Sequence, residues 1–192
     1  MNDEEALSSA VAKSRMVVSL LGPGTREPNP QLYAEFYARL FAIMRRHGVR
    51  RIMASSTASA DDPQDRFSLS LTILVLLVRI FAPGAYRAMR GIAGAFRAEA
   101  SGGGDGGEGA LDWTVFRIPF LPGNPDAESW RRGRDLGAAH VGYPGDGTLG
   151  VSLNRSVLAR WLVDSVENEE EARRWFGKFP AISGPVSKKK TA

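Results

Sequence analysis

The sequence predicts a single α/β domain built on a doubly wound parallel sheet. Its strands are short, continuous apolar runs, a pattern typical of a sheet that helices cover on both faces. Segments with helical periodicity separate these runs, in the order that right-handed crossover connections require. The 192 residues, 43% hydrophobic and 24% charged, suffice for one ordinary globular core.

The N-terminal part alternates helix and strand twice. Residues 3–13 begin with acidic residues and end with lysine, as the helix dipole favours. The apolar run from Met16 to Gly22 predicts a strand that glycine and proline terminate. A strand is also expected over 49–57. Between the two strands we expect a helix over 31–47, whose apolar stripe consists of Leu32, Phe36, Leu40, Ile43 and Met44.

The middle of the chain contains its most apolar segment. The run from Leu71 to Val78, extended by Ile80 and Phe81, falls short of the roughly 20 residues that a membrane-spanning helix needs. We therefore expect a buried helix over 69–81, interrupted at Pro83-Gly84 and followed by a second helical stretch over 86–100. The low-complexity segment 101–109 predicts a flexible glycine-rich insertion.

The C-terminal part contains one further strong strand. Asp112 to Pro119 has the β-branched and aromatic composition of such a strand. The domain is expected to cover residues 1–182. The other expectations are a long surface loop over 120–139, a short strand over 151–153, a helix over 154–166, an edge strand over 175–179 and a disordered basic tail over 183–192.

Composition narrows the function. The chain has no cysteine, which excludes thiol chemistry and fits a reducing, cytoplasmic location. No secretory signal is evident, and no metal site is expected, since His47 and His140 lie far apart and His47 is typical of a last helical turn. The net charge of +4 is carried mostly by arginine clusters at element ends, which favour a solvated surface over nucleic-acid or membrane binding. A basic nucleic-acid or membrane-surface protein stays open as an alternative.

Three strand ends are the candidate functional site. In a doubly wound sheet, ligands bind beyond the carboxyl ends of the strands. These ends are Leu20–Gly22, Ser55–Thr57 and Arg117–Phe120. Small or hydroxylated residues there let a dinucleotide approach the backbone, although each segment is also explained as a plain strand stop.

Together these strands resemble a known family. Leu-Leu-Gly, Arg-Ile-Met-Ala-Ser-Ser-Thr and Leu-Asp-Trp-Thr-Val-Phe-Arg-Ile-Pro are similar to segments of NmrA-like atypical short-chain dehydrogenase/reductases, above all fungal NAD(P)H-binding members. The resemblance runs from about Leu7 to Phe179 and is strongest over Leu111–Pro119. It implies a Rossmann core that binds NADP or NAD, with reduction of a small carbonyl substrate in some members and cofactor sensing in others.

The resemblance also implies roles for particular residues. Thr57 falls where such reductases place a hydroxyl beside the substrate carbonyl. Tyr86 and Arg90 have the spacing of the Tyr-x-x-x-Lys pair on one helical face, with arginine in the lysine position. The implied cofactor-binding residues are Leu21, Gly22, Ser55, Ser56, Pro119 and Phe120.

The start of the chain departs from the family pattern. No strand, Gly-x-x-Gly-x-x-Gly turn and helix precede the first predicted elements, and Gly102–Gly109 is no substitute because no strand leads into it. The chain is therefore expected to be N-terminally truncated and to lack the first βαβ unit. Its exposed sheet edge invites self-association. Two functions stay open: a reductase in its complete form, and a non-catalytic cofactor-sensing or protein-interaction scaffold.

Overall fold

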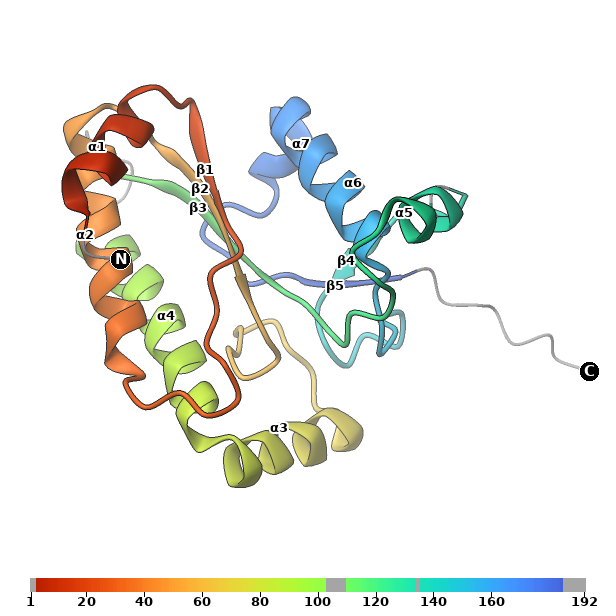
Figure 1. Ribbon diagram of the computed structural model, residues 1–192. Coiled ribbons are helices and arrows are strands. Elements are labelled where there is room, and N and C mark those ends of the chain that lie inside the picture. The colour runs from red at the N-terminus through yellow and green to blue at the C-terminus, as the bar shows by residue number, and fades with distance from the viewer. Residues whose placement is uncertain (1–2, 103–109, 134, 185–192) are drawn as a thin grey trace, which may run out of the picture.

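The computed structural model describes residues 3–102, 110–133 and 135–184, and it confirms the predicted α/β class (Figure 1). One sheet contains five strands in the order β1-β2-β3-β5-β4. The strands are β1 Met16–Ser19, β2 Arg51–Ser56, β3 Asp112–Arg117, β4 His140–Gly142 and β5 Ala181–Ser183. The helices are α1 Glu4–Ala12, α2 Gln31–Arg46, α3 Leu69–Phe81, α4 Pro83–Gly102, α5 Ala127–Gly133, α6 Arg155–Glu167 and α7 Glu169–Arg173.

The sheet is parallel except at one edge. β1, β2, β3 and β5 run in the same direction, and β4 pairs antiparallel with β5. β2 and β3 pair along their whole length and are buried on both faces, which explains their continuous apolar sequences. β1 is the other edge, where Val18 is 40% exposed.

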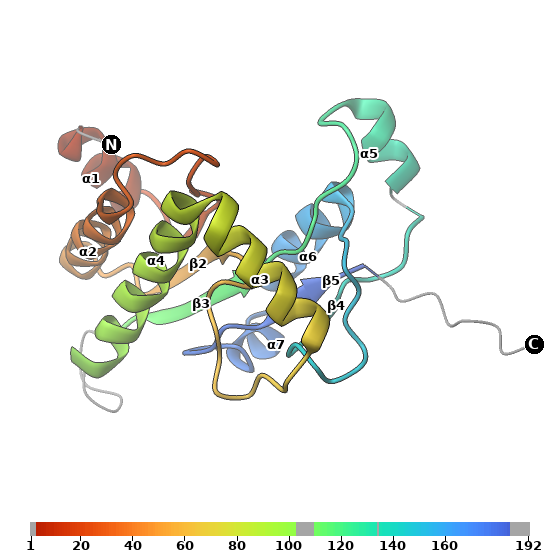
Figure 2. The same ribbon diagram turned by 90° about the horizontal axis from the view of Figure 1, so that it is seen from below.

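Helices cover both faces of the sheet. α1, α2 and α4 lie on one face, and α6 and α7 lie on the other (Figures 1 and 2). The larger core lies under α2 and α4, where the ring of Phe96 contacts Tyr37, Phe41 and Trp113 at centroid distances of 5.1, 4.9 and 5.6 Å. This aromatic cluster joins the two helices to β3.

The buried stripe of α2 is centred on tyrosines. Tyr33 and Tyr37 are buried, whereas the predicted stripe residues Leu32 and Phe36 are only partly covered. A tyrosine hydroxyl is tolerated in a core when it finds a partner. The hydroxyl of Tyr37 shares a 2.8 Å hydrogen bond with Ser19 at the end of β1, which brings the tip of this strand against the helix.

Several predictions in the C-terminal part were wrong. The expected loop over 120–139 contains α5, and the expected strand over 151–153 reduces to a single bridge between Ser152 and Phe120. The expected edge strand over 175–179 is mostly a turn, because Gly177 adopts a φ of +71°. β5 follows it and lies inside the sheet, so Ser183 belongs to a strand and not to the tail. Residues 185–192 lie outside the described residues.

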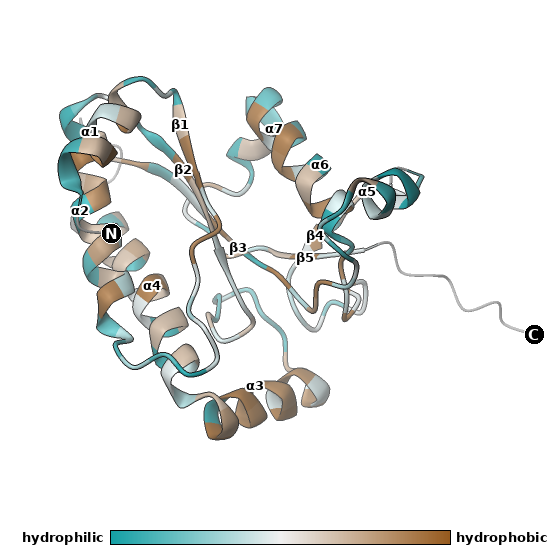
Figure 3. Ribbon diagram, viewed as in Figure 1, coloured by the Kyte–Doolittle hydropathy of each residue, from teal (hydrophilic) through white to brown (hydrophobic). Residues whose placement is uncertain are grey.

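The predicted burial of the apolar helix 69–81 was also wrong. α3 forms as expected, but none of its residues is buried. Figure 3 shows it as a nearly continuous apolar helix that stands apart from the sheet. An apolar composition indicates that a helix is stabilised by burial, but it does not show whether other parts of the chain pack against that helix.

We expect Phe96→Ala to lower the free energy of unfolding by about 3–5 kcal/mol, because it removes a fully buried ring from the contacts of three others. Urea unfolding followed by circular dichroism measures the change. Val163→Ala on the exposed side of α6 is the control and should stay within about 0.5 kcal/mol. Equal effects of the two substitutions would contradict this description of the core.

Candidate functional site

A cavity of about 670 Å³ opens at the carboxyl ends of β2 and β3, beside the first residues of β5. The strand ends form its floor, α3 forms one wall, and the loop that follows β4 forms another. Its size and mostly apolar lining are typical of a small-molecule site. The residues that line it are Thr57, Ala58, Ser59, Ser68, Ser70, Leu71, Leu74, Val75, Val78, Arg117, Ile118, Pro119, Phe120, Pro144, Gly145, Leu149, Gly150, Val151, Ser152, Ala181 and Ile182.

Three of the residues predicted from the sequence lie together in this cavity. Thr57 follows β2, and Pro119 and Phe120 follow β3, so the parallel pairing of the two strands brings them to one edge. Ser56 stands opposite Arg117 in the register, which places the two exits side by side. The sequence thus located the floor of the cavity, and α3 adds one of its walls.

The other predicted cofactor-binding residues lie near this edge without lining the cavity. Ser55 and Ser56 are buried, and the Ser56 hydroxyl donates to the sulfur of Met89 at 3.6 Å. Gly22 follows β1, and a Cβ there would lie 3.2 Å from the methyl group of Met89. Leu21 packs partly against the larger core. The binding roles of these four residues stay predictions.

Tyr86 and Arg90 occupy a different hollow. They line a space of about 650 Å³ at the corner between α3 and α4, together with Arg79, Pro83 and Arg87. Arg90 also lies 3.4 Å from the carboxylate of Asp61. The structure therefore does not bring these two side chains into the cavity that contains Thr57, and their catalytic role stays a prediction.

A buried ion pair holds the floor of the cavity. The Arg117 side chain is 2% exposed, and its two terminal nitrogens donate to the Asp65 carboxylate at 2.5 and 2.7 Å. Arg117 donates a further bond to the Ala60 carbonyl at 3.0 Å. Because Asp65 precedes α3, the pair ties the segment between β2 and α3 to the end of β3.

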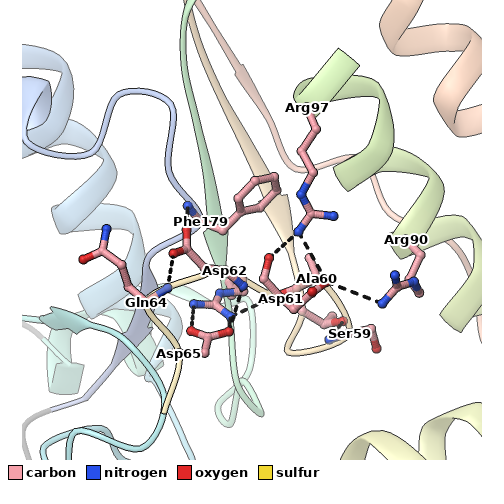
Figure 4. A network of polar contacts seen from close by, with 11 residues as sticks. Ser59, Ala60, Asp61, Asp62, Gln64, Asp65, Arg90, Arg97 and Phe179 are labelled. Carbon is pink, nitrogen blue, oxygen red and sulfur yellow. Dashed lines mark hydrogen bonds and ion pairs between the residues drawn. The ribbon is translucent and has the colours of Figure 1, made fainter. Parts of the chain in front are cut away.

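The acidic segment before α3 is fixed at both ends (Figure 4). Asp62 accepts hydrogen bonds from the backbone amides of Gln64 at 2.9 Å and Phe179 at 3.0 Å. Asp61 accepts from Arg97 on α4. Partial burial acts to raise the pKa of Asp61, but a backbone hydrogen bond and the charges of Arg97 and Arg90 bring it below the usual value.

One hydroxyl beside this network is unsatisfied. The Tyr143 hydroxyl oxygen is buried and has no hydrogen-bond partner among the described residues. Burial, followed by the charge of Asp62, raises the pKa of Tyr143. A neutral phenol is therefore the favoured state in the fold.

Sequence reasoning missed Asp65 and Tyr143, and it included Arg117 in a strand end without recognising its buried ion pair. A charged residue at the end of an otherwise apolar strand requires a buried partner, so Arg117 was a usable signal. Its partner lies 52 positions away, which no local pattern reveals. Within residues 3–102, 110–133 and 135–184, no cluster of three possible metal ligands was found.

No protein-family model matches the sequence, and a search of curated proteins finds no significant relative. Solved structures share its fold. One is a wide-type short-chain dehydrogenase/reductase from Veillonella parvula in complex with NADP, with a TM-score of 0.64 and 13% identity over 99% of this chain and 70% of that one.

Two further solved structures are similar. An anaerobillin reductase from Escherichia coli O157:H7 gives a TM-score of 0.56 at 11% identity, with coverage of 97% of this chain and 73% of its own. The oxidoreductase YlbE from Lactococcus lactis gives 0.55 at 14% identity, with coverage of 96% and 68%. At these identities the likeness shows the fold alone, which is Rossmann-like.

We expect Asp65→Ala to lower the free energy of unfolding by about 3–5 kcal/mol, because it leaves the Arg117 guanidinium buried without its counter-charge. Urea unfolding measures the effect. Asp61→Ala is the matched control: its carboxylate is 67% exposed, and the expected loss is below about 1 kcal/mol. The double variant Asp65→Leu/Arg117→Met should recover much of the loss, and no recovery would show that the charges themselves are required.

Tyr143→Phe should leave stability at neutral pH unchanged or raise it by up to about 1 kcal/mol, since it removes an unpaired buried hydroxyl. The raised pKa of Tyr143 also predicts how stability depends on pH. Stability that depends on the neutral phenol is complete below the unfolded pKa of about 10 and is lost as the pH rises through the folded pKa. Urea unfolding at neutral and alkaline pH should show the variant declining less steeply than the wild type. A clear loss at neutral pH would show that the hydroxyl is bonded.

Proposed function

We propose that this chain binds a nicotinamide dinucleotide, NADP or NAD, and is part of a reductase for a small carbonyl compound. The observation that carries the proposal is the apolar cavity at the carboxyl ends of the strands, where Thr57, Pro119 and Phe120 meet. The NADP complex of the Veillonella parvula protein, which has the same fold, supports the choice of cofactor. Membership of the NmrA-like group and a cytoplasmic location are finer parts of the same proposal.

The cavity walls fit the nicotinamide end of such a cofactor. The bound nucleotide would supply a hydride. Apolar residues of α3 and the Pro119-Phe120 segment exclude water from the ring, and the Thr57 hydroxyl donates a hydrogen bond to the carbonyl oxygen of the substrate. The lining carries one charged side chain, Arg117, which Asp65 neutralises. The substrate that suits this site is therefore uncharged and largely apolar.

The pyrophosphate needs a further unit. No Gly-x-x-Gly-x-x-Gly turn leads from a strand into a helix among residues 3–102, 110–133 and 135–184. A preceding βαβ unit would supply it, and the open edge of β1 is the place where it would pair. The sequence upstream of the Met1 codon tests this idea directly. Without such a unit, the same edge is available for self-association.

A second candidate is a cofactor-sensing or interaction scaffold without catalysis. Arg90 stands in the lysine position of the Tyr-x-x-x-Lys pattern and is paired with Asp61. Tyr86 lies in the α3–α4 hollow rather than beside Thr57. Both observations favour binding without turnover.

Fluorescence titration of the purified chain with NADPH tests dinucleotide binding. We expect saturable binding that Ser152→Phe weakens about tenfold, or roughly 1.4 kcal/mol, because the ring enters the cavity. Ser9→Phe, on the exposed side of α1, is the control and should keep the wild-type affinity. If the wild type and Ser152→Phe bind NADPH with the same affinity, the cofactor binds outside this cavity. Absence of binding would favour the scaffold.

A further inference from the structure

We propose that the outer face of α3, with the arginines at its C-terminal end, docks on the surface of a membrane that contains anionic phospholipids. This inference is independent of the proposed reductase function. It starts from the exposure of α3. From the sequence we expected this apolar helix to be buried in the protein and therefore out of contact with a membrane, and its exposure removes that reason.

The two sides of α3 have different surroundings. Leu71, Val75 and Val78 face the cavity and are half-buried. The opposite side exposes an apolar stripe at helical spacing, formed by Leu69, Ile73, Leu76, Leu77 and Ile80. Phe67 and Phe81 extend this stripe at its two ends and are 82% and 77% exposed. A helix that is apolar all round requires cover on both sides, and the described residues cover one.

Cations lie at the end of this stripe. Arg79 on α3 and Arg87 on α4 line the hollow at the α3–α4 corner beside Tyr86. Asp61 contacts Arg90 and Arg97. Among the ion pairs of the described residues, none includes Arg79 or Arg87.

An apolar stripe that ends in uncompensated arginines matches the layers of an anionic bilayer surface. The apolar side chains enter the boundary of the acyl region, and the guanidinium groups contact lipid phosphates. The rim of a protein interface is generally polar, whereas this end of the stripe is bordered by arginines of one sign of charge. The cationic corner therefore favours lipid as the occupant.

The helix is suited to lying on a membrane rather than crossing it. Of the helices in the described part of the chain, none alone is long and apolar enough to span a bilayer; only α3 and α4 together pass on length and composition, and they are bent by 116°. α4 is committed to the protein core, where Ala88, Ile92 and Phe96 are fully buried. This leaves α3 as the element available to lipid.

Vesicle flotation with the full chain tests the proposal. We expect the protein to float with vesicles of phosphatidylcholine and phosphatidylserine in equal parts, to float much less with phosphatidylcholine alone, and to be released by salt. Ile73→Asp/Leu77→Asp should abolish flotation. Arg79→Gln and Arg87→Gln should each weaken it about fivefold.

Matched variants control for general effects of charge. Val163→Asp/Val166→Asp makes the same change on the exposed side of α6, and Arg131→Gln/Arg132→Gln removes cations from α5; both should float like the wild type. Circular dichroism checks that each variant is folded. Failure of the wild type to float on anionic vesicles, or flotation of Ile73→Asp/Leu77→Asp at the wild-type level, overturns the proposal. A wild-type dimer that this variant converts to a monomer, with no vesicle binding, would assign the face to a second copy instead.

Discussion

The ion pair between Arg117 and Asp65 determines how the chain is arranged around the cavity. A buried guanidinium is tolerated when its charge is matched, and Asp65 supplies that match while the Ala60 carbonyl accepts a further bond, so the pair fixes the positions of both partners. Asp65 thereby holds the segment between β2 and α3 against the end of β3. The next residue extends the constraint, because the Arg66 amide donates to the Pro144 carbonyl at 2.8 Å. A side chain at Gly145 would meet the Arg66 carbonyl at 2.4 Å, so the two loops touch backbone to backbone.

This anchoring explains why α3 stands away from the sheet. The helix is held at its N-terminal end by the network around Asp65 and at its C-terminal end by the turn into α4. At that turn, Gly84 lies so close to the Glu27 carbonyl that a Cβ would approach it to 2.2 Å. Because both ends are fixed, α3 is held in position without packing of its middle residues against the strands. The space left beneath it is the cavity, and the apolar residues left above it are exposed.

The sequence was informative wherever the signal is local. Helical periodicity and dense apolar runs located α1, α2, α6 and the three long parallel strands, and the parallel pairing that followed placed Thr57 beside Pro119. It failed where distant contacts decide. β4 and β5 have three residues each and exist because they pair with each other and, through Arg117 and Ala181, with β3. The exposure of α3 depends on an anchor formed by residues 52 positions apart, so its composition alone could not distinguish a core helix from a surface one.

The distribution of charge around α3 links the cavity to the outer surface. Inside the cavity, Asp65 neutralises the charge of Arg117, so the lining is apolar apart from a few hydroxyl groups. Outside, at the C-terminal end of α3, Arg79 and Arg87 have no ion-pair partner among the described residues, and Arg90 contacts Asp61. One apolar helix therefore lies between a neutral cavity and an outer surface that is apolar along the helix and cationic at its C-terminal end. The core that α2, α4 and the strands form contains no residue of α3, so this helix contributes to the wall of the cavity and not to that core. Because Leu71, Val75 and Val78 line the cavity from the other side of the same helix, lipid contact on the outer face of α3 would bear directly on one wall of the cavity.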